Sequence, residues 1–315
     1  MKFSHVILAG LVLMLLLSGC SQAAPVEKES AAGALKIKDF TGRTLSFDES
    51  PQRIVALSTG DMSILYALGG EAVGRPTAEL PDSLQKAKSV QTIGTTHQFD
   101  VELITSLKPD VVLGNEQLNS KDISTIEGIG SQLLLTSANS VKDIQRQISL
   151  FGELLGKQQK AKALNDEIDE RKKQVKQPKK KVKTLVVYGA PGTYMAALPQ
   201  SLSGDLLHIA GGANIAEKEP ALEKFPQYAQ INAEKVIEAD PDLILLMTHS
   251  NPEDVKAGFM SEMKQNAAWH DVSAVKNGRV EILPSDLFGT NPGADVIKAI
   301  DELEKRLKRL KRLSS

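Results

Sequence analysis

The sequence predicts an α/β protein of two lobes, and the first observation is a segment that occurs twice. Residues 102–113 and 234–245 each begin with a glutamate and continue as a short helix-like run. Each then reaches a Pro-Asp pair at the same offset, followed by an apolar run rich in β-branched residues. Proline ends the helix, and the apolar run is typical of a buried parallel strand. Because solenoids repeat at much shorter periods, the repeat favours two similar lobes, although this joint also arises by chance in α/β proteins.

Two further observations complete the fold class. Apolar runs alternate with helical patterns on both sides of the chain's middle, which specifies parallel, doubly wound sheets. Residues 140–176 instead form a long, Pro-free helical stretch with a break expected near Gly156. We therefore predict two Rossmann-like lobes joined by one long, rigid α-helix. The N-terminal lobe is expected to span 35–139, the helical connection 140–178, and the C-terminal lobe 179–315.

The N-terminal segment is predicted to address and tether the protein. Residues 1–19 resemble a signal peptide, with an apolar core too short for a comfortable membrane span, and they end in Leu-Ser-Gly before Cys20. This ending resembles a lipobox, at which bacteria attach a diacylglyceryl group to the cysteine and cleave before it; an ordinary signal peptide with an incidental cysteine is the alternative. We expect lipidated Cys20 and a flexible tether over 20–34 to hold the protein on the extracytoplasmic face of the cell membrane.

Composition and the strand ends exclude several classes of function. The 315 residues carry 38 basic and 39 acidic side chains and a formal net charge of -1, which argues against nucleic acid as a partner. A single cysteine allows no internal disulfide. We find no Ser-His-Asp or paired-carboxylate arrangement at the strand ends, so we expect a binding protein and not an enzyme. We also expect a monomer.

The N-terminal lobe is predicted from its turn and cap signals. Residues 35–47 resemble a hairpin, and 54–57 a buried strand. The next helix opens with four small or polar residues, Ser58, Thr59, Gly60 and Asp61. Free N–H groups at such a start bind anions, although Ser and Thr also cap helices without a ligand. The remaining elements are short strands at 72–74 and 90–93, loops at 76–89 and 94–100, and a helix capped by Asp100.

The C-terminal lobe continues the alternation. Its predicted elements are a strand at 183–188, a loop at 189–195, helices at 203–210 and 252–263, a strand at 280–283, a loop at 288–293 and a closing helix at 294–313. Leucines at 303, 307, 310 and 313 follow one face of the closing helix, which predicts docking against the protein rather than a membrane surface.

Two histidines fall where a ligand is expected. Doubly wound sheets bind ligands beyond the carboxyl ends of their strands. His97 lies in such a loop of the first lobe and His249 in one of the second, whereas His208 and His270 lie in or beside helices. A single loop histidine is usually an ordinary surface residue, but one per lobe indicates a shared site.

The chemistry of an imidazole pair limits which ligands the site could bind. Imidazole ligates Zn, Cu or haem iron. A closed zinc site or a direct manganese site needs further ligands, and these loops hold few carboxylates and no cysteine. Two opposed imidazoles suit a metal that is already chelated, as in haem, with His97 and His249 as axial ligands. The nearby apolar side chains fit a porphyrin face, unless they are ordinary core: Met62, Phe99, Tyr194, Met195, Met247 and Phe288.

Four stretches carry a resemblance to a known family, at 187–195, 204–214, 241–255 and 266–277. They include Gly-Asp-Leu-Leu-His-Ile-Ala-Gly-Gly-Ala-Asn and Lys-Gln-Asn-Ala-Ala-Trp. These resemble substrate-binding proteins of ABC importers for iron-siderophores, haem and cobalamin, which implies the class III periplasmic-binding-protein fold. Within that group the chain is most similar to haem-receptor lipoproteins of Gram-positive iron-regulated surface-determinant systems. The resemblance runs from about residue 50 to the C-terminus and implies haem b as the transported ligand.

The resemblance implies roles for single residues. His249 stands in the Leu-x-x-His-x-x-Pro-Glu-x-Val context of the family's second-lobe iron ligand. The family's first-lobe ligand is a methionine, and His97 replaces it here, which exchanges one good haem ligand for another. The family's propionate contacts are backbone N–H groups that map to Ser58, Thr59, Gly60 and Asp61. Its basic and tyrosine contacts in the following loop are replaced by Ala78-Glu79-Leu80.

The resemblance also implies partners. Haem would come from an upstream haem-donor protein and pass to an ABC permease driven by its ATPase. One surface glutamate per lobe pairs with permease arginines in this superfamily, and Glu102 and Glu234 are the matching positions, although a glutamate at a helix start also complements the helix dipole. The close alternative ligand is a ferric siderophore, whose pockets usually present Arg, Trp or Tyr, and these loops hold few of them. An extracellular enzyme is the alternative of another class.

Overall fold

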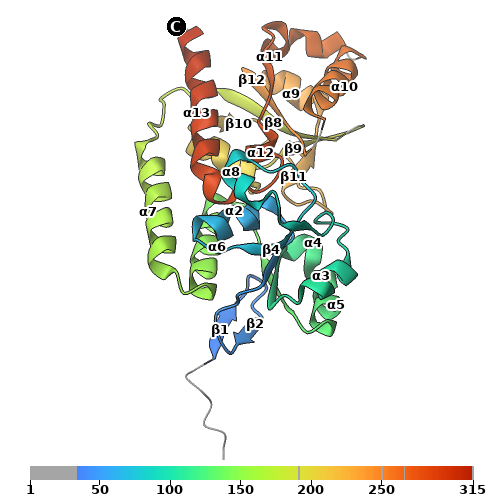
Figure 1. The fold of residues 1–315 in the computed structure, drawn as a ribbon. Helices are drawn as coiled ribbons and strands as arrows, with labels where there is room; N and C mark the ends of the chain where they lie inside the picture. The colour runs from blue at the N-terminus through green and yellow to red at the C-terminus, as the bar shows by residue number, and fades with distance from the viewer. Residues whose placement is uncertain (1–33, 191, 250, 266, 314–315) are drawn as a thin grey trace, which may run out of the picture. The chain divides into compact units, whose positions relative to one another are not determined.

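The computed structural model describes residues 34–190, 192–249, 251–265 and 267–313 (Figure 1). Residues 35–315 form one compact unit. The predicted signal peptide, Cys20 and all of the tether except Ala34 lie outside the described residues. Across the part of the chain that the structure describes, no helix combines the length and the apolar character needed to cross a bilayer.

The fold begins with the predicted hairpin. Strand β1 (Leu35–Lys38) pairs antiparallel with β2 (Thr44–Phe47). The buried carboxylate of Asp39 accepts hydrogen bonds from the backbone N–H groups of Thr41 and Arg43, both over 3.0 Å. An aspartate that binds its own downstream backbone closes a tight turn, so this side chain holds the two strands together.

Five parallel strands form the sheet of the first lobe in the order β5-β4-β3-β6-β7. Counted from β3, this is the 3-2-1-4-5 order of a Rossmann-like half-sheet, as predicted. The strands are β3 (Ile54–Ala56), β4 (Ala72–Arg75), β5 (Gln91–Thr92), β6 (Val111–Asn115) and β7 (Gln132–Thr136). The helices are α2 (Thr59–Ala67), α3 (Val101–Leu107), α4 (Glu116–Asn119) and α5 (Ile123–Gly128), with 3-10 helices η1 (Asp82–Ala87) and η2 (Ser120–Asp122). Helix η1 lies inside the segment predicted as the 76–89 loop.

A six-stranded mixed sheet forms the second lobe, in the order β11-β9-β8-β12-β13 with β10 beside β8. Strands β8, β12 and β13 run parallel, whereas β9 is antiparallel to both β8 and β11. The strands are β8 (Lys183–Ala190), β9 (Thr193–Ala197), β10 (Ala213–Asn214), β11 (Tyr228–Gln230), β12 (Leu243–Met247) and β13 (Val280–Ile282). The helices are α8 (Leu202–Ile209), α9 (Ala233–Ala239), α10 (Pro252–Gln265), η3 (Ala267–Asp271), α11 (Ser273–Lys276), α12 (Ser285–Phe288), η4 (Gly293–Asp295) and α13 (Val296–Leu313).

The prediction of a loop at residues 189–195 is wrong. Strand β8 continues to Ala190, and the chain reverses to form β9, which places Tyr188 opposite Met195. Gly192 has φ +74°, a conformation that glycine adopts without strain, and it permits this tight reversal. Tyr194 and Met195 are therefore strand residues, and their side chains point to opposite faces of the sheet.

The repeated segment has the same structure in both lobes. Helices α3 and α9 each end at a left-handed residue directly before the proline, Lys108 with φ 46° and Asp240 with φ 44°. The aspartate after each proline then binds the start of the neighbouring strand. Asp110 accepts from two backbone N–H groups just before β3, both over 2.8 Å, and Asp242 accepts from the first N–H of β8 over 2.9 Å. The repeat therefore fixes strand order locally in each lobe.

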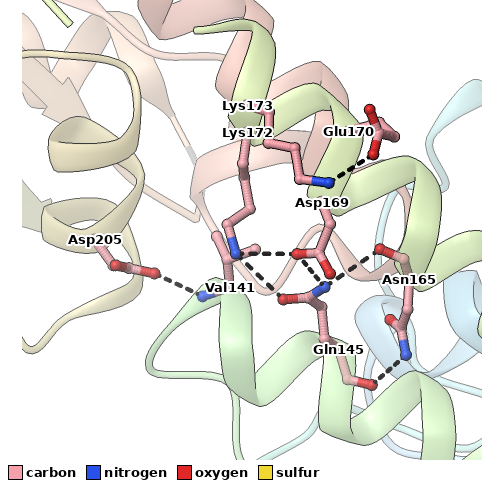
Figure 2. Close-up of polar contacts among 8 residues, drawn as sticks. All are labelled: Val141, Gln145, Asn165, Asp169, Glu170, Lys172, Lys173 and Asp205. Atoms are coloured by element: carbon pink, nitrogen blue, oxygen red, sulfur yellow. Dashed lines mark hydrogen bonds and ion pairs between the residues drawn. The ribbon is translucent and has the colours of Figure 1, made fainter.

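The connection between the lobes is a pair of helices, α6 (Val141–Leu154) and α7 (Gln158–Gln174). The chain breaks between them at Gly156, with φ +63°, where the sequence predicts a break. Figure 2 shows how the pair is joined, because Gln145 and Asn165 each donate from the side-chain amide to the other's backbone carbonyl, over 3.3 and 3.0 Å. Reciprocal contacts of this kind stiffen the connection although it is not one continuous helix.

The closing helix α13 docks as predicted. Leu303, Leu307 and Leu310 are buried in the core shared with the sheets. Arg171 of α7 forms ion pairs with Asp301 and Glu304 of α13, over 2.5 and 2.8 Å. The helix connection is therefore held against the C-terminal end of the chain by charge as well as by apolar packing.

Candidate functional site

The first turn of α2 is built around a buried carboxylate. The Ser58 hydroxyl caps the helix by accepting from the Asp61 N–H over 3.0 Å, and it donates to Asp61 Oδ2 over 2.6 Å. Asp61 Oδ1 accepts from Gln147 Nε2 of α6 over 2.5 Å, and the same amide nitrogen donates to Thr136 Oγ1 over 2.9 Å. Asp61 is 3% exposed. Its side chain therefore points toward α6 and away from solvent.

Burial dominates the protonation of this carboxyl group. Removal from water disfavours the charged form and raises the pKa of Asp61 from its ordinary 3.8 to about 6, although hydrogen bonds from Ser58 and Gln147 act in the opposite direction. The folded protein therefore holds a proton on Asp61 at pH values where the unfolded chain has lost it.

A loop of the second lobe, residues 289–293, covers the start of α2. A Cβ on Gly60 would lie 2.6 Å from the carbonyl oxygen of Asn291, so only glycine allows this approach. Asn291 Nδ2 also donates to Gln147 Oε1 over 3.1 Å. Gly60 is buried, whereas Ser58 and Thr59 are half-buried. Because the loop covers Gly60, only Ser58 and Thr59 of the predicted anion site stay partly accessible to a ligand.

His249 lines a cavity of about 190 Å³. The cavity lies between the end of the first lobe at Asn139 and second-lobe residues that include Ser203, Tyr228 and Phe288. Its lining, in the described chain, contains no lysine or arginine. The volume is below the roughly 300–1,000 Å³ of small-molecule pockets. A larger ligand would therefore extend from this cavity over the exposed imidazole of His249.

The two predicted histidines interact electrostatically across the lobes. Neighbouring groups partly desolvate the His249 ring although the residue is exposed, which lowers its pKa below the ordinary 6.5, and the charge of His97 lowers it further. His97 is exposed at a turn that is anchored on the first lobe. The Thr96 hydroxyl donates to the Leu57 carbonyl over 2.7 Å, and Asn119 Nδ2 donates to the Thr96 carbonyl over 3.2 Å. These bonds tie the His97 turn to the end of β3.

Two tyrosines that were not predicted from the sequence lie beside His249 in the structure. The Tyr188 ring packs edge-on against the His249 ring, with centroids 5.4 Å apart, and lies 5.6 Å from the Tyr228 ring. Burial raises the pKa of both phenols, that of Tyr228 to about 12 with a contribution from Tyr188, so both are neutral at physiological pH. Tyr188 could have been found as the end of a predicted strand. Nothing in the sequence around Tyr228 predicts strand β11, so its place beside Tyr188 could not be predicted.

Several predicted pocket residues lie elsewhere. Met62 and Met247 are buried in the main hydrophobic core. Tyr194 faces α10, where its ring packs 5.1 Å from that of Phe259 and its hydroxyl donates to the Val255 carbonyl. These three placements correct the prediction. They arise because the side chains point to the packed face of their element, which the loop assignment could not show.

The remaining predicted residues have mixed placements. Met195 is half-buried on β9, and Phe99 is half-buried against the hydrophobic cluster that includes Ile93 and Ile104. Phe288 is buried and also lines the cavity. Glu102 and Glu234 are exposed in the first turns of α3 and α9, which fits either proposed role. Within the described ranges, no three His, Cys, Asp or Glu residues are grouped as a metal site would require.

Comparison with known proteins identifies close relatives. The profile of the periplasmic binding protein family matches residues 54–287. The high-affinity heme uptake system protein IsdE of Staphylococcus aureus strain Newman is 32% identical over 257 residues, which are 80% of this chain and 85% of that protein. The crystal structure of S. aureus IsdE complexed with heme superposes with a TM-score of 0.70, covering 81% of this chain and 98% of that one.

Two further solved structures are similar to this chain, one at higher and one at lower sequence identity. An ABC transporter substrate-binding protein from Listeria monocytogenes EGD-e has 31% identity and a TM-score of 0.70, and the match covers 82% of this chain and 99% of that one. The siderophore binding protein BauB, solved with two molecules of acinetobactin and ferric iron, has 22% identity and a TM-score of 0.69 over 87% of this chain and 98% of its own. At 22% identity, the similarity to BauB shows a shared fold alone.

The raised pKa of Asp61 predicts a pH dependence of stability. Because the folded state holds this proton more tightly, the group stabilises the fold below about pH 4, and the contribution is lost as pH rises through about 6. We expect the free energy of unfolding to fall by about 2 kcal/mol more in the wild type than in Asp61→Asn between pH 4 and 7. Urea unfolding at several pH values measures this, and equal slopes in the two proteins would contradict it.

Proposed function

Because the chain belongs to the periplasmic binding protein family, we propose that it is the haem-binding component of an ABC-type haem importer. The observation that carries this proposal is the pair His97 and His249, one from each lobe, with His249 lining the cavity and the His97 turn tied to the end of β3. Similarity to IsdE, whose crystal structure was solved with heme, supports the same ligand. Haem b is the cargo, held between the lobes with the two imidazoles as axial ligands of its iron.

The protonation state of the site suits iron binding. Imidazole ligates a metal through a neutral ring nitrogen. The low pKa of His249 keeps that ring neutral at physiological pH. Tyr188 and Tyr228 form an aromatic wall beside it, and rings of this kind pack well against the face of a porphyrin.

A ferric siderophore is the alternative cargo. The two tyrosines weaken the sequence argument that the site lacks aromatic hydrogen-bonding groups. Ferric siderophores are commonly anionic, however, and no basic side chain lines the described cavity. Desolvating a net negative ligand there would lack compensating charge, which favours haem.

The proposal extends to partners and location. We infer a monomeric, non-enzymatic lipoprotein, anchored through Cys20 on the extracytoplasmic face of the cell membrane. It would accept haem from a donor protein and deliver it to a permease and its ATPase. Glu102 and Glu234, exposed at equivalent helix starts of the two lobes, are the proposed contacts with permease arginines.

Hemin titration tests the ligand. In the soluble domain that begins after Cys20, wild type is expected to give a saturable, sharp Soret band with low-spin features. His97→Ala and His249→Ala should each alter the band, because each removes an axial ligand. His270→Ala, which changes an exposed histidine outside the site, is the matched control and should behave as wild type.

A broad, non-saturating spectrum that is the same in all four proteins would refute haem binding. The ferric-siderophore alternative would then be tested by quenching of Trp269 and tyrosine fluorescence.

Permease docking is tested separately from haem binding. We expect Glu102→Arg combined with Glu234→Arg to leave hemin binding unchanged, because both residues lie outside the site. Stimulation of the importer's ATPase in proteoliposomes should fall at least about tenfold, since like charges would face each other. Glu167→Arg, an exposed glutamate of α7, is the control. Full stimulation by the double variant would rule out this docking mode.

The anchor has its own test. Cys20→Ser removes the thiol that accepts the diacylglyceryl group, so the variant should move from the membrane fraction to the culture medium or a soluble extracytoplasmic fraction. Detergent-phase partitioning of wild type and variant measures the change. If both proteins partition alike, Cys20 is not the anchor.

A further inference from the structure

A continuous set of hydrogen bonds and close contacts joins the two histidines through the base of the site. On the first-lobe side, the His97 turn is held on Leu57, which directly precedes the Ser58 cap of α2. On the second-lobe side, Gly289 packs on the backbone of His249, because a Cβ there would lie 3.3 Å from its Cα. The 289–293 loop thus runs from His249 to the start of α2.

One side chain bridges the two halves. Gln147 is 1% exposed, and its amide is satisfied on both sides. The nitrogen donates to Asp61 and Thr136 in the first lobe, and the oxygen accepts from Asn291 in the 289–293 loop. A planar amide has fixed donor and acceptor directions. The position of Asn291 relative to Asp61 is therefore set by the plane of the Gln147 amide.

The loop is stiff enough to transmit this position. Asn291 Oδ1 accepts from the Gly293 N–H over 2.8 Å, which closes the loop on itself. The Ala294 N–H then donates to Ser63 Oγ of α2 over 3.1 Å, and a Cβ on Gly293 would lie 2.5 Å from the Gly60 carbonyl. Backbone contacts this close leave little room for independent movement.

We propose that Gln147 is a positioning residue of the ligand site, and that its amide sets the separation of His97 and His249 by joining Asp61 to Asn291. The effect on ligand binding rests on the proposed haem function, whereas the effect on the separation of the lobes does not. Loss of the amide would remove the hydrogen bonds that Gln147 makes with Asp61 Oδ1 and Asn291 Nδ2, and the 289–293 loop would keep only its remaining contacts with α2.

The chain supplies a matched control on the same helix. Gln145 lies two residues from Gln147 and makes amide hydrogen bonds of the same kind, but to Asn165 and Asp169 of α7 (Figure 2). Gln145→Leu therefore removes an equivalent amide without touching the site. Comparison of Gln147→Leu with Gln145→Leu separates positioning of the ligand site from general packing of α6.

The test uses the soluble domain, whose residues 35–315 form one compact unit. We expect Gln147→Leu and Asn291→Ala each to speed hemin dissociation about tenfold, the effect of losing one hydrogen bond to a buried partner. The double variant should show less than the product of the two effects, because both remove the same connection. Gln145→Leu should release hemin at the wild-type rate. Wild-type rates in folded Gln147→Leu and Asn291→Ala, or fully multiplicative effects, would overturn the proposal.

A second measurement does not need the ligand. Spin labels at Glu102→Cys and Glu234→Cys report the distance between lobes, because the soluble domain has no native cysteine. Gln147→Leu and Asn291→Ala should broaden the distance distribution, and Gln145→Leu should not. If Gln147→Leu does not fold, Asn291→Ala decides. If wild type fails to bind hemin, the haem function is wrong, and the label distances alone support or reject the positioning role.

Discussion

A buried carboxylate held by a buried amide joins the first turn of α2 to α6 and, through Asn291, to the 289–293 loop of the second lobe. Asp61 costs free energy away from water, and the cost is offset only while Ser58 and Gln147 donate to it. Gln147 in turn accepts from Asn291, so α2, α6 and the 289–293 loop take their positions together. The close backbone approach at Gly60 is a consequence of this arrangement, because any larger residue would push the loop away from the amide that receives it.

The elements with local signals could be predicted from the sequence. Asp100 caps α3 by accepting from the Leu103 N–H over 3.0 Å, as its position before an apolar run indicates. Gly156 breaks the interlobe segment where a C-cap glycine is expected. The repeated Pro-Asp pair predicted two lobes, and each aspartate binds the start of a neighbouring strand. Such features depend on residues near one another in sequence, so they can be predicted without knowledge of the fold.

The features that sequence reasoning missed depend on distant partners. Met62 was assigned to the pocket because it follows the helix start, yet Gly60 to Leu65 are all buried and no apolar stripe marks which face meets the ligand. Tyr228 lies on β11, a three-residue strand that exists through pairing with β9. Its contact with Tyr188, and through it with His249, arises only when β8, β9 and β11 assemble into one sheet. Gln147 falls on the apolar face of α6, three residues after Ile144 and four before Phe151, but the helix pattern cannot show which distant groups a buried glutamine would bind.

The distribution of charge in the site constrains its ligand more strongly than its shape does. Partial desolvation and the charge of His97 lower the pKa of His249, and burial raises the pKa of Tyr188 and Tyr228, so all three changes favour the neutral forms. The described cavity walls carry no lysine or arginine to balance an anion. A ligand charged throughout would lose its hydration there without replacement. Haem carries its anionic groups on one edge, which can stay at the Ser58 and Thr59 rim or in water while the apolar ring meets the aromatic wall. In the proposed haem complex the two histidines would ligate the iron from both lobes, so the separation that we propose Gln147 to set would be a condition for that ligation.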